Sequence, residues 1–238
     1  MSDALDQPKG YRFPNVVIRH AVYLSHRYTL SHRDVQEPMF ERGVDVSHET
    51  VRQWCSRFGP DIAEQLKALE PRRGRTWHVD EVRLDTGGTI RWLWRAINEH
   101  GNVLDVLLQD RRDTEAAVRF FRRLLDHVEG PESIVSDGLG SHGAAMREVQ
   151  ELVAVEHVKV LAKERQNNLV EQSHRPTRDQ ERQQQGFQDP RRAQGFLTTH
   201  ARIGNLFART RARTPACERR HNLRRAFETW SGVSLRVA

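Results

Sequence analysis

Apolar residues recur with two different periods along the 238-residue chain, and the change of period divides it in two. From Asn15 to Phe58 they recur every three or four positions, which predicts amphipathic helices. From Trp77 to Leu108 they alternate or form short runs, which predicts strands. The pattern therefore predicts a small all-helical segment followed by a mixed α/β segment.

The helical segment is expected to hold three helices, the last two with recognisable starts. Ser31 and Ser47 can each cap a helix, and Asp34 completes a short capping box with Ser31. Gly43 provides the turn between these two helices. Two capped helices around a glycine turn have the layout of a helix-turn-helix, although a small helical bundle with a merely solvated outer face fits the same pattern.

If the segment reads DNA, its third helix presents the exposed polar side chains. The candidate DNA contacts there are His48, Arg52, Gln53 and Arg57. Glu49 argues the other way, since a carboxylate repels phosphates, unless it accepts from a cytosine amine. Pro60 and Pro71 are expected to bracket a separate short helix over residues 61–69.

The mixed segment follows a recognisable order of elements. We expect strands over 77–84, 89–97 and 103–108, a helix over 114–127, a strand over 133–136, a helix over 144–153, a strand over 157–160 and a last helix containing Glu171. This is the order of the ribonuclease-H-like fold, an α/β (α+β) architecture in which a mixed sheet is flanked by helices. In that fold the first strand, the fourth strand and the last helix converge.

Three acidic residues occupy those three elements. Asp80 lies in the first strand, Asp137 follows the fourth, and Glu171 lies in the last helix. Carboxylates are the ligands that hard Mg²⁺ or Mn²⁺ ions prefer, and two such ions can stabilise the attacking and leaving oxygens of a phosphoryl transfer. Individually, Asp80 could be an ordinary surface residue, and Asp137 could merely cap a turn. Glu81 neighbours Asp80 but faces the other side of the sheet, so its substitution is expected to be mild.

Several sequence blocks resemble one family. Residues 77–81, 91–96, 101–105 and 167–178 resemble, in order and spacing, the DDE transposases of the sixth insertion-sequence family, which transpose replicatively. The resemblance covers residues 13–230. It implies DNA strand cleavage and strand transfer at terminal inverted repeats, with two Mg²⁺ ions (Mn²⁺ as a substitute) held by Asp80, Asp137 and Glu171. It also selects Asp80 over Glu81 and places Arg178 against DNA.

Four positions depart from the family pattern, and two of them, Leu169 and Val170, replace a more polar pair. Gly138 stands where a lysine is expected after the second aspartate, and His142 stands where an aromatic residue is usual. Neither change removes a metal ligand, but loss of a positive charge beside Asp137 would weaken the positioning of DNA. Two alternatives to an active transposase therefore stay open. One is a catalytically inactive DNA-binding remnant or regulator of the element, and the other is a host nuclease of the same fold.

Composition fits a DNA-binding protein. The net charge is +6 and comes almost entirely from arginine, whose planar fork pairs with phosphates, although a genome-wide preference for arginine would give the same excess. Further candidate DNA contacts are Arg72, Arg73, Arg75, His174, Arg175, Arg178 and Arg182. The expected partners are the terminal inverted repeats and target DNA, bound by a homodimer or higher multimer.

The remaining expectations concern location and domains. The chain has two cysteines, no apolar run of membrane-spanning length and no signal-peptide pattern, so we expect a cytoplasmic, nucleoid-associated protein without membrane contact. The expected division is a flexible leader at 1–12, a helix-turn-helix domain with spacer at 13–70, a ribonuclease-H-like DDE catalytic domain at 71–190, and an arginine-rich helical region at 191–238.

Overall fold

A computed structural model of the chain describes residues 7–70, 74–160, 168–184, 186–208 and 214–234, without the side chains of 168–171 and 234. Its backbone forms two compact units. The helical unit combines Met1–Glu70 with Gly195–Ala238, and the mixed unit is Pro71–Gln194. Part of the expected leader, residues 1–6, lies outside the described residues. The expected division into functional domains stays a prediction.

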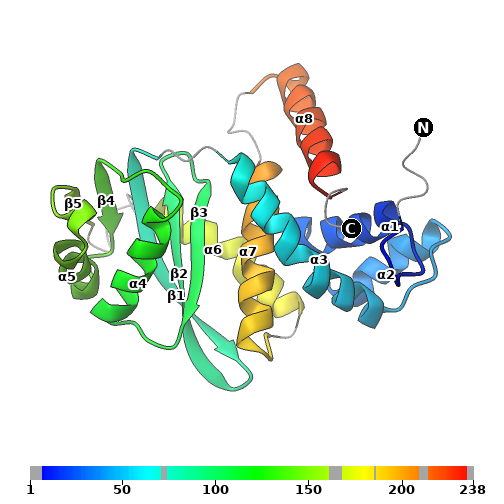
Figure 1. The fold of residues 1–238 in the computed structure, drawn as a ribbon, viewed down its shortest axis with the longest axis horizontal. Coiled ribbons are helices and arrows are strands. Elements are labelled where there is room, and N and C mark those ends of the chain that lie inside the picture. The colour runs from blue at the N-terminus through cyan, green and yellow to red at the C-terminus, as the bar shows by residue number, and fades with distance from the viewer. Residues whose placement is uncertain (1–6, 71–73, 161–167, 185, 209–213, 235–238) are drawn as a thin grey trace. The chain divides into compact units, whose positions relative to one another are not determined.

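The helical unit begins with the three expected helices (Figure 1). They are α1 (Asn15–Arg27), α2 (His32–Glu41) and α3 (His48–Leu69). The capping box is confirmed, because the Ser31 side chain accepts from the Asp34 backbone and the Asp34 carboxylate accepts from the Ser31 backbone. Ser47 likewise caps α3 by accepting from the Thr50 N–H. These caps satisfy backbone donors that have no partner within their own helix.

The predicted break at Pro60 is wrong, because α3 runs through it as one helix. Proline removes one helical hydrogen bond, a cost that tertiary packing has to offset. Phe58 and Ile62 are buried on either side of Pro60. A Cβ on neighbouring Gly59 would lie only 3.1 Å from Oγ1 of Thr199, so the chain packs closely against α3 at this point. We infer that this packing stabilises the continuous helix and offsets the hydrogen bond lost at Pro60.

Two helices from the end of the chain complete the helical unit. Residues of α7 (Pro190–Leu206) from Gly195 on and all of α8 (Ala216–Ser234) belong to it. Tyr23 of α1 contacts Phe207 at a ring distance of 5.0 Å and Trp230 at 5.9 Å. The helix-turn-helix pair therefore shares one hydrophobic core with residues almost 200 positions later in the sequence.

The mixed unit is built on a five-stranded sheet with the order β3-β2-β1-β4-β5. Its strands are β1 (Thr76–Thr86), β2 (Thr89–Asn98), β3 (Val103–Gln109), β4 (Ser133–Ser136) and β5 (Glu156–Lys159). The first three strands are antiparallel neighbours, and β4 and β5 continue the sheet in parallel with β1. This mixed order confirms the ribonuclease-H-like fold that the sequence predicts.

Helices cover both faces of the sheet (Figure 1). They are α4 (Thr114–Leu125), α5 (Gly140–Glu148) with a short 3₁₀ turn (Gln150–Leu152), and α6 (Asn168–Gln183). The predicted helix over 144–153 thus begins four residues early and ends in the 3₁₀ turn. Among the described residues, no helix is long and apolar enough to span a membrane.

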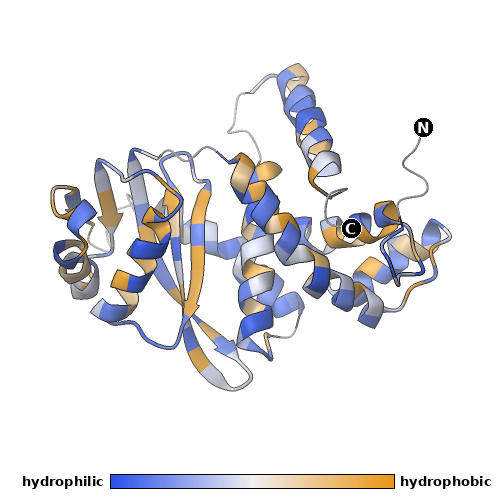
Figure 2. Cartoon of the chain, viewed as in Figure 1, coloured by the Kyte–Doolittle hydropathy of each residue, from blue (hydrophilic) through white to orange (hydrophobic). Residues whose placement is uncertain are grey.

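The hydrophobic core of the mixed unit lies between the sheet and α4. Trp77, Val79 and Trp94 from the sheet pack with Phe120 and Phe121 of α4, and all five are fully buried. Figure 2 shows the same distribution, with β3 coloured as hydrophobic and α4 divided between hydrophobic and hydrophilic residues. Because strand residues alternate between faces, Glu81 shares this core-facing side and Asp80 lies on the side of α6.

The helical unit also contains a half-buried histidine whose titration links stability to pH. Burial, together with the nearby charges of Arg52 and His48 and against a smaller opposing effect of Glu49, lowers the pKa of His32 to about 4. In the unfolded chain this group titrates near its ordinary value of 6.5. Between pH 6.5 and 4 the unfolded state therefore binds more protons than the folded state.

We predict that the free energy of unfolding falls as the pH is lowered from 6.5 towards 4, by up to about 3 kcal/mol from His32. Urea unfolding at pH 7 and pH 5, followed by circular dichroism, measures this loss. His32→Gln cannot titrate and should lose less stability over the same interval. An equal loss in the variant and the wild-type chain would contradict the assignment to His32.

Candidate active site

Asp80 lies in the middle of β1, the central strand of the sheet. Its partner across the antiparallel pairing with β2 is Arg95. The Asp80 side chain is 17% exposed, so it is reachable from solvent although its strand is covered on both faces. A partly exposed carboxylate on a central strand is well placed to bind a ligand and is held in position by the surrounding sheet.

Arg95 fixes α6 to the face of the sheet that carries Asp80. Its buried guanidinium donates to the carbonyl of Ser173 and to the hydroxyl of Thr177, both on α6. Burial lowers the pKa of Arg95 to about 10, against the opposing charge of Asp80, so the group stays protonated at neutral pH. Pro176 has no N–H, so the carbonyl four residues before it, that of Gln172, lacks its helical donor. The Ser173 carbonyl, which accepts from Arg95, is the next one along the helix. Arg95 therefore both places α6 and supports it where its own hydrogen bonding is interrupted.

His174 makes a direct contact between α6 and Asp80. Its Nε2 lies 3.4 Å from Oδ2 of Asp80, and the residue is only 2% exposed. Burial lowers the pKa of His174, although the hydrogen bond to Asp80 opposes this shift. The expectation that His174 contacts DNA is thereby corrected. The ring is enclosed between helix and sheet, where it supports the carboxylate of Asp80.

Glu171 lies on α6 one helical turn before His174. Residues three apart on a helix share a face, so the backbone of Glu171 lies along the same line of α6 as the residue that touches Asp80. The side chain of Glu171 lies outside the described residues. Its convergence with Asp80 and Asp137 accordingly stays a prediction, which the placement of α6 supports.

Asp137 directly follows β4, the strand that pairs in parallel with β1. Its Oδ1 accepts from the backbone N–H of Leu139 at 3.1 Å, and its Oδ2 lies 3.3 Å from an Nη2 donor of Arg112. The Asp137 side chain is 33% exposed. Both oxygens of this carboxylate are therefore oriented, and the group still faces solvent.

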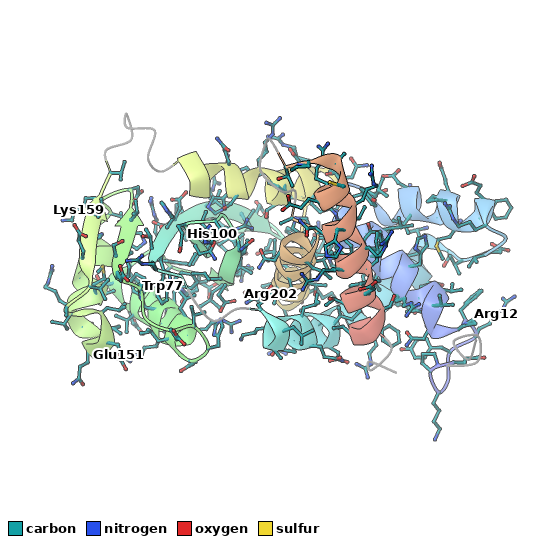
Figure 3. The ribbon with its side chains drawn as sticks, turned by 90° about the horizontal axis from the view of Figure 1, so that it is seen from above. Arg12, Trp77, His100, Glu151, Lys159 and Arg202 are labelled. Atoms are coloured by element: carbon teal, nitrogen blue, oxygen red, sulfur yellow. The ribbon has the colours of Figure 1, made fainter. Side chains whose placement is uncertain are left out.

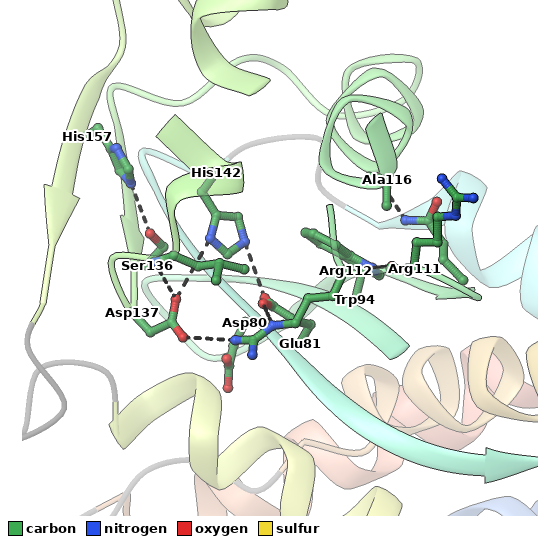
Figure 4. A network of polar contacts seen from close by, with 12 residues as sticks. Asp80, Glu81, Trp94, Arg111, Arg112, Ala116, Ser136, Asp137, His142 and His157 are labelled. Carbon is green, nitrogen blue, oxygen red and sulfur yellow. Dashed lines mark hydrogen bonds and ion pairs between the residues drawn. The ribbon is translucent and has the colours of Figure 1, made fainter. Parts of the chain in front are cut away.

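Arg112 joins Asp137 to Glu81 (Figure 4). Its Nε donates to Glu81, whose carboxylate is fully buried, and its guanidinium lies 5.0 Å from the ring of Trp92. The other oxygen of Glu81 lies 3.3 Å from Nε2 of His142. Partial burial lowers the pKa of Arg112, but the hydrogen bond and charge of Glu81 and the charges of Asp137 and Asp80 raise it overall. Arg112 was not among the predicted site residues, and Glu81 was expected to face away from the site.

Two of the departures from the family pattern, Gly138 and His142, each have a structural reason. Gly138 has a φ of 80°, a left-handed conformation that lysine adopts only under strain. Lys159 stands beside it at the end of β5, with its Cβ 3.9 Å from where a Cβ of Gly138 would lie (Figure 3). The backbone of the Asp137 loop is thus in contact with a lysine of the neighbouring strand. His142 is fully buried against Trp94 and Phe121, so it fills an aromatic position while its nitrogens face Glu81 and Asp137.

Asp80 and Asp137 suit a hard divalent ion. Both supply carboxylate oxygens and remain partly exposed. His174 contacts one oxygen of Asp80, while Leu139 and Arg112 each hold one oxygen of Asp137. Among the side chains that the structure describes, no three His, Cys, Asp or Glu residues form a metal-binding group, and Glu171 is not among them. The described donors fit two of the three ligands that the sequence predicts.

The predicted DNA contacts of α3 lie on its outer face. His48, Gln53 and Arg57 are exposed and Arg52 is half-buried. Arg52 donates to Glu49 at 2.8 Å, and this hydrogen bond lowers the pKa of Glu49 to about 2. Glu49 therefore holds Arg52 in place along the helix, and its own negative charge is offset there.

The remaining predicted contacts are spread over a linker and α6. Arg72 and Arg73 lie outside the described residues, while Arg75 is exposed and paired with Glu132 at 2.8 Å. The three arginines predicted on α6, namely Arg175, Arg178 and Arg182, are all exposed. Available positive charge therefore lies on the same helix as Glu171. Whether these side chains bind DNA stays a prediction.

Comparison with known proteins agrees with this geometry. The sequence model of a family described as a DDE domain, of the IS240 type of transposase, matches residues 74–210. The chain is 34% identical over 164 residues to the transposase for the insertion sequence-like element IS431mec of Staphylococcus aureus, covering 69% of this chain and 73% of that one. It is 32% identical, with the same coverage, to the transposase for insertion sequence element IS257 in transposon Tn4003 of Staphylococcus aureus.

Two solved structures are also similar at low sequence identity. The catalytic core domain of BIV integrase is 12% identical, covers 65% of this chain and 99% of its own, and has a TM-score of 0.41. The catalytic domain of Mos1 mariner transposase is 13% identical, covers 76% and 93%, and also has a TM-score of 0.41. On the family match and the identity to the insertion-sequence transposases, the chain belongs to the DDE transposases of the sixth insertion-sequence family, which are polynucleotidyl transferases.

Proposed function

We propose that this transposase cleaves one DNA strand at each end of its element and joins the freed 3′-OH to target DNA, using Asp80, Asp137 and Glu171 to hold two Mg²⁺ ions. The observation that carries the proposal is the docking of α6 at Asp80. Arg95 and His174 place the helix that contains Glu171 against the strand that contains Asp80. Arg112 contacts Asp137 and is also influenced by the charge of Asp80.

When bound, the two ions would supply an activated oxygen nucleophile and stabilise the leaving oxygen of an in-line displacement at phosphorus. Neighbouring residues hold the carboxylates of Asp80 and Asp137 in position for this chemistry. His174 restrains one oxygen of Asp80, and the N–H of Leu139 and Arg112 restrain the two oxygens of Asp137. Mn²⁺ has the same preference for oxygen ligands and should substitute.

Positive charge near the acids would hold the DNA backbone. We propose that Arg175, Arg178 and Arg182 on α6, with Arg72, Arg73 and Arg75, bind phosphates without reading sequence. Recognition of the terminal inverted repeats is assigned to α3 through His48, Arg52, Gln53 and Arg57. An element has two ends that need the same reaction, so we expect at least a homodimer on DNA.

Removing one acidic charge separates chemistry from binding. Asp80→Asn, Asp137→Asn and Glu171→Gln should each lower strand cleavage and joining more than about 100-fold, because a two-ion site lacking one carboxylate cannot stabilise both oxygens. Binding to the element ends should persist or rise, because repulsion of phosphates falls. Strand-transfer assays on pre-cleaved ends in Mg²⁺, beside gel-shift binding, measure both.

Asp85→Asn is the matched control for these variants. Asp85 lies on the same strand as Asp80, is exposed, and accepts from the Gly88 N–H in the hairpin turn. This control should retain cleavage and joining. Retained joining by Asp80→Asn would show that the first ligand is misassigned. A wild-type chain that binds element ends and never cuts them would indicate the inactive remnant.

The outer face of α3 offers a test of end recognition. Gln53→Ala and Arg57→Ala should each reduce the preference for element ends over random duplex by about 1–3 kcal/mol, the usual effect of removing a side chain that contacts a base. Competition between labelled end DNA and random DNA at fixed salt measures the preference. Arg83→Ala, an exposed arginine on β1, controls for the loss of one positive charge. An unchanged preference in both α3 variants would exclude this face as the reading surface.

A further inference from the structure

The buried carboxylate of Glu81 has a defined set of partners. Its side chain has no exposed surface, and it is paired with Nε of Arg112 through Oε1. Its Oε2 lies 3.3 Å from Nε2 of His142, which is also fully buried. A carboxylate taken out of water is costly unless it is paired. Glu81 is therefore a buried ion-pair partner that holds the side chain of Arg112 in position.

Arg112 is restrained on a second and a third side. The ring of Trp92 lies 5.0 Å from its guanidinium carbon. Its Nη2 reaches Oδ2 of Asp137 at 3.3 Å. Arginine presents its donors in a rigid planar fork, so a guanidinium fixed by Glu81 and Trp92 aims its remaining donors in set directions. One of these directions leads to Asp137.

Arg112 interacts with both described acids of the site, through a hydrogen bond in one case and through its charge in the other. Arg112 contacts Asp137 and is also influenced by the charge of Asp80 (Figure 4). Because Glu81 carries one negative charge and Arg112 one positive charge, the pair adds little net charge beside the acids. It supplies a directed hydrogen bond to Asp137 without placing an uncompensated cation where a metal ion has to bind. Nothing in the catalytic assignment of the three acids requires this pair.

We propose that Glu81 and Arg112 form a positioning pair for Asp137, with Arg112 orienting the carboxylate and Glu81 acting through Arg112. This rests on the proposed function, in which Asp137 is a metal ligand. Partners that orient a ligand in this way typically change metal affinity 10–100-fold when they are replaced. The pair also changes the expectation for Glu81, whose substitution should not be mild.

Direct metal binding tests the pair separately from activity. The full chain is titrated with Mn²⁺, and free Mn²⁺ is followed by electron paramagnetic resonance. Arg112→Lys keeps the charge but not the fork, and Glu81→Gln keeps the shape but not the charge. Each should weaken Mn²⁺ binding about 10–100-fold. The double variant should bind no more weakly than either single variant, because the two residues act as one unit.

Asp105→Asn is the matched control. Asp105 is a buried carboxylate on β3 that pairs with Arg123 of α4 at 2.7 Å, in the same unit and without a described contact to Asp80 or Asp137. Both Asp105→Asn and Glu81→Gln should lower the free energy of unfolding in urea, but Asp105→Asn should leave Mn²⁺ affinity unchanged. If Asp105→Asn weakens Mn²⁺ binding as much as Glu81→Gln, the effect is general destabilisation and the proposal is overturned.

Asp80→Asn distinguishes failure of the pair from failure of the proposed function. If Asp80→Asn weakens Mn²⁺ binding while Arg112→Lys and Glu81→Gln do not, the metal site stands and the positioning pair is overturned. If Asp80→Asn leaves the affinity unchanged, both are overturned. If Arg112→Lys weakens DNA binding but not Mn²⁺ binding, Arg112 is a phosphate contact rather than a positioning residue.

Discussion

The buried guanidinium of Arg95 determines where the last helix of the mixed unit lies. It stands opposite Asp80 in the sheet and donates to Ser173 and Thr177, so strand and helix are fixed to each other beside the first acid. A buried cation needs partners, and α6 supplies them at the point where Pro176 interrupts its own hydrogen bonding. The backbone position of Glu171 follows from this attachment.

The two faces of β1 each carry one acidic residue with its own set of contacts. On the side of α6, Asp80 meets His174 and the helix that contains Glu171. On the side of α4, Glu81 reaches Asp137 through Arg112. Strand alternation separates the two neighbouring acids as expected, yet both are connected to the site. Asp137 makes this possible because it lies beyond the end of β4, where a side chain is not confined to one face.

Much of the fold was predictable from sequence, and the misses have physical causes. Capping at Ser31 and Ser47 and the order of strands and helices along the chain followed from local chemistry and periodicity. Pro60 misled because tertiary packing overrides the local preference of proline to end a helix. The pairing of Asp80 with Arg95 could have been predicted, because the two-residue Gly87-Gly88 turn sets the register of β1 and β2. The role of Arg112 could not have been predicted, because nothing in the local sequence indicates that a residue before α4 contacts Glu81 and Asp137.

The most direct measurement of the central claim is a crystal structure of the chain on a pre-cleaved element end with Mn²⁺, located by its anomalous scattering. Two Mn²⁺ peaks about 3.5–4 Å apart are expected, with Asp80, Asp137 and Glu171 all within coordination distance. Mn²⁺ bound elsewhere, or a Glu171 carboxylate directed away from the other two acids, would contradict the proposed site.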